Sequence, residues 1–112
     1  MQGFAARVPV LTGSMIDLTV EVERTTSVAE VNALFEDSAL GELSGILEYS
    51  EEPLVSSDVI KSPYSAVFDA GLTIVAGETQ VTVIAWYDNE WGYSTRLGEL
   101  AQRVLAPVTH AV

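Results

Sequence analysis

Few side chains in this 112-residue sequence are suited to covalent or acid–base chemistry. There is no cysteine, which excludes thiol nucleophiles, disulfides and thiolate metal sites. The single histidine, His110, lies near the C-terminus, where we expect solvent exposure and not catalysis. Ser56, Ser57 and Asp58 look like a nucleophile beside an acid, but no histidine is near them in sequence, and such residues are typical of a loop held by side-chain to backbone hydrogen bonds. We therefore assign this chain no catalytic residue and no metal ligand.

Acidic residues outnumber basic ones by sixteen to five, which gives a formal net charge of −11 spread along the chain. The resulting field repels phosphate backbones and anionic lipid surfaces, so nucleic-acid and membrane partners are disfavoured. A phosphate site would depend on a few local cations, for which the candidates are Arg7, Arg24, Lys61, Arg96 and Arg103. No apolar stretch is long enough to cross a bilayer and the N-terminus does not resemble a signal peptide, so we expect a cytoplasmic protein.

Length and composition indicate one globular domain. Hydrophobic residues make up 48% of the sequence and charged residues 19%, which separates it from disordered chains. A chain of 112 residues is too short for a dinucleotide-binding domain together with a substrate domain. Its eight glycines never fall in the spacing of a dinucleotide fingerprint. We therefore predict one domain over residues 1–105, a short tail over 106–112, and no dinucleotide-binding domain.

Apolar and polar residues alternate from Ser14 to Glu23, which predicts a strand with one buried and one solvated face. Residues 80–87 carry apolar groups on both faces, so this strand should lie centrally in the sheet or against a partner surface. Shorter strands are expected over residues 5–10, 45–48, 65–69 and 72–75, and a loop over residues 56–63.

Two helices are predicted. Ser27 followed by Glu30 has the spacing of a capping box, and the helix should run to about Ser38 and stop at Leu40–Gly41. A C-terminal helix should follow residues 88 and 89 and stop before Pro107; its apolar positions are Leu97, Leu100, Val104 and Leu105. Strands combined with two separated helices favour an α+β fold, an antiparallel or mixed sheet with helices on one face.

Three segments together resemble the phosphorylating glyceraldehyde-3-phosphate dehydrogenase family. They are residues 3–9 (GFAARVP), residues 53–58 (PLVSSD) leading to 65–70 (SAVFDA), and residues 86–94 (WYDNEWGYS). The last segment is the most specific, because general strand and helix propensities do not produce such a run. The resemblance covers nearly the whole chain to about residue 105 and implies the C-terminal part of that family's catalytic domain.

The resemblance implies roles for three residues. Arg7 matches an arginine that binds a phosphate of the substrate or the attacking inorganic phosphate, and Asn89 matches an asparagine that hydrogen-bonds the nicotinamide carboxamide. Tyr93 matches a tyrosine beside the nicotinamide ring. Each residue also has a purely structural interpretation: Arg7 in an ion pair, Asn89 with Asp88 as helix caps, and Tyr93 in the core. We expect Arg7 and Asn89 to face one cleft whose reactive floor is supplied by other polypeptide.

The family's reaction uses a cysteine thiolate and a histidine, and neither has a counterpart here. The resemblance therefore implies a fragment that is inactive alone and that uses NAD or NADP only in a complete enzyme. Its implied partners are a missing N-terminal cofactor domain or intact subunits in a homo-oligomer, and exposed apolar surface should drive association. The alternative is a stand-alone interaction module derived from that domain.

Overall fold

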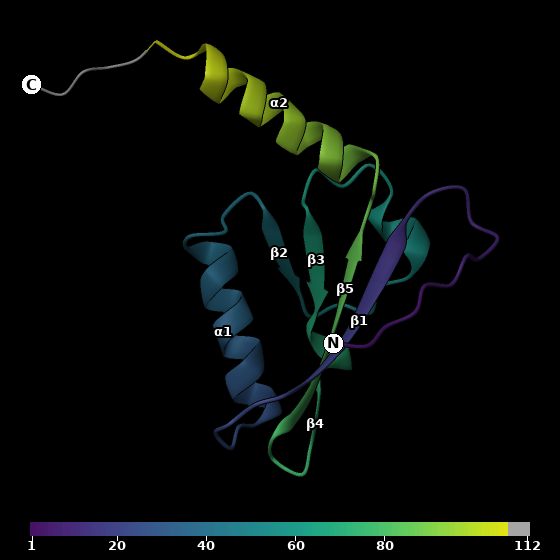
Figure 1. Cartoon of the computed structure of the whole chain (residues 1–112), viewed down its shortest axis with the longest axis vertical. Helices are drawn as coiled ribbons and strands as arrows, with labels where there is room; N and C mark the ends of the chain where they lie inside the picture. The colour runs from purple at the N-terminus through teal and green to yellow at the C-terminus, as the bar shows by residue number, and fades with distance from the viewer. Residues whose placement is uncertain (108–112) are drawn as a thin grey trace, which may run out of the picture.

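A central strand, β5 (Gln80–Tyr87), organises the sheet in the computed structural model, which describes residues 1–107. β1 (Ser14–Glu21) pairs antiparallel with one edge of β5, and β3 (Ala66–Asp69) pairs antiparallel with the other. β2 (Leu47–Ser50) lies parallel to β3, so the order is β1-β5-β3-β2 (Figure 1). The short β4 (Ile74–Ala76) pairs with the first half of β5. The two-sided apolar pattern of residues 80–87 therefore marked the central strand, as expected.

Local signals define the first helix, α1 (Val28–Leu40). The Ser27 hydroxyl accepts a hydrogen bond from the backbone N–H of Glu30 at 3.2 Å, which satisfies a donor that the first turn leaves free. At the other end, the N–H of Gly41 bonds to the Asp37 carbonyl at 2.9 Å and the helix stops. The predicted cap and the predicted end at Leu40–Gly41 are both confirmed.

The core lies between α1 and strands β2 and β3 and is centred on Phe68, whose side chain is 1% exposed. The Phe35 ring from α1 stacks on Phe68 with the ring centroids 4.1 Å apart, and Tyr49 lies at 5.8 Å. Asn32 fastens the helix by donating to the Ala70 carbonyl at 3.1 Å. α1 thereby covers the β2 and β3 side of one sheet face.

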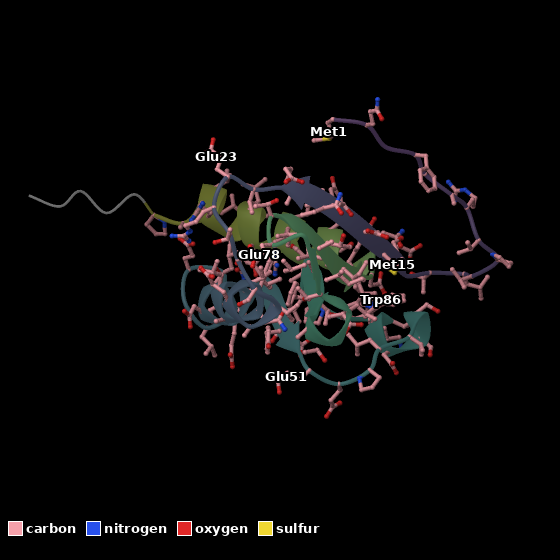
Figure 2. All side chains as sticks on the ribbon, turned by 90° about the horizontal axis from the view of Figure 1, so that it is seen from below. Met1, Met15, Glu23, Glu51, Glu78 and Trp86 are labelled. Atoms are coloured by element: carbon pink, nitrogen blue, oxygen red, sulfur yellow. The ribbon has the colours of Figure 1, made fainter. Side chains whose placement is uncertain are left out.

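The prediction of a strand over residues 5–10 is wrong. Residues 1–13 contain no helix or strand, and Figure 2 shows the chain from Met1 running clear of the sheet before it reaches Met15. A strand needs a neighbour for its backbone groups, and β1 pairs with β5 alone among the described residues. The loop expected over residues 56–63 contains a short 3₁₀ helix, η1 (Ser56–Val59).

The buried face expected for β1 is also not observed. Ile16, Leu18 and Val20 retain 38% to 51% of their exposure although they lie opposite apolar residues of β5. These side chains stay exposed because α1 packs at the β2 side of the sheet and no helix covers the β1 side among residues 1–107 (Figure 1). Alternation identified the strand correctly, but burial depends on what packs against it.

The second helix, α2 (Trp91–Leu105), starts just beyond the end of β5 and points away from the sheet (Figure 1). Leu97, Leu100 and Val104 on this helix are 52%, 55% and 72% exposed. A five-stranded mixed sheet with two helices, one of them C-terminal, confirms the α+β fold class. No helix in residues 1–107 is both long and apolar enough for a membrane crossing. His110 lies outside the described residues.

Candidate functional site

A pocket of about 270 Å³ opens where β5 ends and α2 begins. Asn89 and Tyr93, two of the three predicted site residues, both line it. The remaining lining residues are Ser65, Tyr87, Asp88, Gly92 and Arg96. Pockets for small molecules usually span about 300 to 1,000 Å³, so this pocket lies near the lower end of that range and has room for a ring-sized group.

Asp88 caps the start of α2 and is almost completely buried, with 1% of its surface exposed. Its Oδ1 accepts the backbone N–H groups of Glu90 and Trp91, each at 2.9 Å, and its carbonyl accepts the N–H of Gly92. These bonds satisfy donors that the first turn of a helix cannot pair internally. Of the two cap candidates read from the sequence, Asp88 therefore does the capping, and Asn89 is left free to face the pocket.

The same carboxylate reaches two other segments. Its Oδ2 accepts the backbone N–H of Lys61 at 2.8 Å, and the Thr12 hydroxyl approaches Oδ1 at 3.5 Å. Burial by itself raises the pKa of Asp88, but the backbone hydrogen bonds from Trp91, Lys61 and Glu90, with Thr12, outweigh it and leave the pKa below its usual range. Asp88 is therefore held as a carboxylate.

Lys61 adopts a left-handed backbone conformation with φ of 65°. This conformation costs a residue with a side chain about 1 to 2 kcal/mol, because its Cβ crowds the backbone. The hydrogen bond from the Lys61 N–H to Asp88 helps to offset that strain. The loop after η1 and the start of α2 therefore stabilise each other.

Two further contacts fix the direction in which α2 leaves the sheet. Gly92 comes so close to the Tyr64 carbonyl that a Cβ built on it would lie 2.9 Å from that oxygen. One turn later, Arg96 donates to the Ser65 hydroxyl at 3.1 Å and to the Gly45 carbonyl at 3.3 Å. The helix is therefore anchored through its first two turns, although its later turns extend into solvent.

Arg7, the third predicted site residue, does not line the pocket. It lies in the extended segment before β1, and its side chain is exposed. Arg7 and Asn89 therefore share no pocket within residues 1–107, and the expectation that they face one cleft completed by other polypeptide stays a prediction. The role of Arg7 in phosphate binding stays a prediction.

Sequence reasoning named Arg96 only as one of five available cations and did not place it in the site. Its spacing was a usable signal, because positions 89, 93 and 96 are four and three residues apart, which places them on one side of the start of α2. Ser65 gave no such signal, since only the tertiary fold brings it beside α2. Asp58 behaves as the loop interpretation expects: its carboxylate accepts the N–H of Val55 at 2.8 Å. Residues 1–107 contain no group of three side chains arranged to hold a metal ion.

Comparison with known proteins identifies the family. The family model described as glyceraldehyde 3-phosphate dehydrogenase, C-terminal domain, matches residues 1–89. The chain belongs to the glyceraldehyde 3-phosphate dehydrogenase family. The family assignment made from residues 3–9, 53–70 and 86–94 is therefore confirmed, although the model match ends at the start of the α2 cap.

Several relatives named glyceraldehyde-3-phosphate dehydrogenase extend the match beyond residue 89 and into α2. The protein from Mycobacterium leprae is 52% identical over 100 residues, which are 89% of this chain and 29% of that protein. The protein from Mycobacterium avium is 50% identical over 104 residues, 93% of this chain and 30% of its own length. Glyceraldehyde-3-phosphate dehydrogenase 2 from Streptomyces avermitilis is 53% identical over 100 residues, 89% of this chain and 30% of its own length. The chain thus spans about 30% of the length of these relatives.

Proposed function

We propose that this chain supplies part of the catalytic domain of an NAD- or NADP-dependent glyceraldehyde-3-phosphate dehydrogenase, with residues 1–105 as that part. The observation that carries the proposal is the meeting of Asn89 and Tyr93 at one pocket at the start of α2. The catalytic thiol, the histidine and the dinucleotide-binding domain would come from polypeptide outside the chain, which itself has no cysteine. The chain alone is then inactive.

The pocket suits a nicotinamide ring in size and chemistry. An asparagine amide offers both a donor and an acceptor, which matches a carboxamide, and a tyrosine ring offers a flat apolar surface to an aromatic ring. When bound, the nicotinamide accepts or returns a hydride. The contribution of this chain is to hold the carboxamide through Asn89 and to limit rotation and exclude water through Tyr93. The remainder of the dinucleotide would be held by the dinucleotide-binding domain outside this chain.

Arg7 would bind a phosphate group in the assembled enzyme. A guanidinium presents planar, permanently charged donors that suit phosphate oxygens. Its exposure in the segment before β1 leaves it available for such contacts once companion polypeptide is in place. The net charge of −11 repels phosphate, and Arg7 supplies a local attraction that opposes this field. Removal of Arg7 should therefore weaken phosphate binding strongly.

The experiment is complementation. The chain is mixed with the N-terminal part of a relative, carrying the dinucleotide-binding domain, the cysteine and the histidine, and aldehyde- and phosphate-dependent reduction of NAD or NADP is followed by absorbance. We expect the mixture to be active and each part to be inactive when assayed separately. Arg7→Ala should raise KM for phosphate at least tenfold, on the order of the 1.5 to 3 kcal/mol of a charged hydrogen bond. Arg24→Ala is the matched control, since Arg24 is exposed and its one ion pair within residues 1–107 is with the exposed Glu30.

Exposed apolar surface supports a second candidate, a module that associates with itself or with intact subunits. Leu97, Leu100 and Val104 form an exposed face that continues from Tyr93, and Ile16 and Leu18 are exposed on β1. Under this alternative, the chain joins or inhibits intact homo-oligomers and restores no activity to the N-terminal part. A stable monomer by sedimentation that binds no hydrophobic dye would contradict association of either kind.

A further inference from the structure

The Asp88 carboxylate connects three parts of the chain that are distant in sequence. Oδ1 accepts hydrogen bonds from the N–H groups of Glu90 and Trp91 at the start of α2, and the Thr12 hydroxyl lies 3.5 Å from the same oxygen. Oδ2 accepts a hydrogen bond from the backbone N–H of Lys61, which lies 27 residues earlier in the chain. Helix capping requires only one acceptor oxygen. The second oxygen therefore does something that capping alone does not explain.

Asn89 lies between these fixed points. Its neighbour Asp88 is buried and bonded on both carboxylate oxygens, and the next N–H, that of Glu90, is bonded to Asp88 at 2.9 Å. None of the hydrogen bonds among residues 1–107 uses the Asn89 side chain, which is exposed at the pocket. The backbone of Asn89 is therefore held on both sides, while its amide stays available for a ligand.

The Lys61 contact also connects the two walls of the pocket. Residues 61–64 continue to the Tyr64 carbonyl against which Gly92 packs, and then to Ser65, which lines the pocket. By bonding Lys61, the carboxylate fixes that wall relative to the start of α2. Loss of this bond would leave Lys61 in a left-handed conformation without its acceptor, so the loop should relax and the pocket should change shape.

We propose that Asp88 is a positioning residue for the Asn89 side-chain amide, which would bind the cofactor. Because Asp88 hydrogen-bonds both the start of α2 and the loop that contains Lys61, it sets the direction in which Asn89 presents its side chain. This inference rests on the proposed function for its ligand, a nicotinamide carboxamide. Asp88 also lines the pocket, but its carboxylate oxygens already accept the N–H groups of Lys61, Glu90 and Trp91, so its proposed role acts through Asn89.

A double-mutant cycle in the complemented enzyme tests the proposal. Asp88→Ala should raise KM for the nicotinamide cofactor about tenfold, which corresponds to about 1.4 kcal/mol, and leave KM for phosphate unchanged. In an Asn89→Ala background, Asp88→Ala should change the cofactor KM less than about twofold, because the group that it orients is gone. A purely structural role predicts the same tenfold factor in both backgrounds, and that result would overturn the proposal.

Asp88→Ser covers the case in which Asp88→Ala does not fold. Serine keeps an acceptor for the start of α2 but is too short to reach Lys61 as well. We expect an intermediate rise in cofactor KM, about threefold, with the rise again absent in the Asn89→Ala background. An unchanged KM in Asp88→Ser would show that the Lys61 bond does not orient the amide, and would refute that part of the proposal.

A measurement on the chain itself separates failure of this inference from failure of the proposed function. ¹⁵N relaxation of the Asn89 side-chain amide reports its order without any activity. The order parameter should fall in Asp88→Ala and recover partly in Asp88→Ser, whether or not the mixture is active. If the wild-type mixture is inactive and the order parameter still falls, the cofactor assignment is wrong and the positioning holds. If the order parameter does not change, the positioning is wrong.

Discussion

Replacing Gly92 with alanine tests how closely α2 packs against the rest of the domain. A Cβ at this position would lie 2.9 Å from the Tyr64 carbonyl oxygen and 3.6 Å from the Ser65 Cα, whereas ordinary van der Waals contact begins at 3.4 Å. The nearest atoms belong to backbone, so no flexible side chain can move aside. Either the helix or the 64–65 segment must shift by several tenths of an ångström.

Gly98 provides a matched control on the same helix. Its added Cβ would have no neighbour within 4 Å, so Gly98→Ala should only gain helix propensity, up to about 1 kcal/mol. Gly92→Ala gains at most a similar amount but adds an overpacking cost of about 1 to 3 kcal/mol. Since the propensity terms largely cancel, the two variants should differ by about 1 to 3 kcal/mol in the free energy of unfolding, with Gly92→Ala the less stable.

The assay is urea unfolding of both variants together with amide hydrogen exchange. In Gly92→Ala, exchange should accelerate at the Trp91 amide and at the amides of the helical turn that follows residue 92, where the helix is forced away from Tyr64. In Gly98→Ala it should slow or stay the same. Equal stabilities for the two variants would refute the argument, because they would mean that the start of α2 can move without loss and is not anchored by the Asp88, Gly92 and Arg96 contacts.

Three further predictions follow from the same structure. The pKa of Asp88 is lower in the folded state than its unfolded value of about 3.9. Ionised Asp88 therefore contributes its full stabilisation of the fold above about pH 3.9, and this contribution is lost as the pH falls through the folded-state pKa. Acid unfolding of Asp88→Asn should lack that part of the pH dependence. Phe68→Ala removes a ring stacked on Phe35 and should lower the free energy of unfolding by about 3 to 5 kcal/mol in chemical denaturation. Leu97→Ser with Leu100→Ser should weaken self-association in sedimentation with little loss of stability, since both side chains are exposed.

Local sequence patterns were sufficient for most of the elements. Alternation marked β1, the two-sided apolar pattern placed β5 centrally, and the Ser27 cap and Gly41 end bounded α1. These features depend on neighbours within a few residues, whose side chains either satisfy backbone groups or share a face. The family could be recognised for a similar reason, because residues 86–94 form one continuous run.

The sequence by itself therefore determined most of the elements, the fold class, the family and two of the pocket residues, Asn89 and Tyr93, which are four positions apart at the start of α2. Tertiary structure alone decided the rest. The bonds from Asp88 to Lys61 and from Arg96 to Gly45 join residues 27 and 51 positions apart, and the unpaired segment around Arg7 and the uncovered face of β1 depend on which neighbours are present. Burial and pairing are properties of two surfaces in contact, and a pattern along one strand describes only one of them.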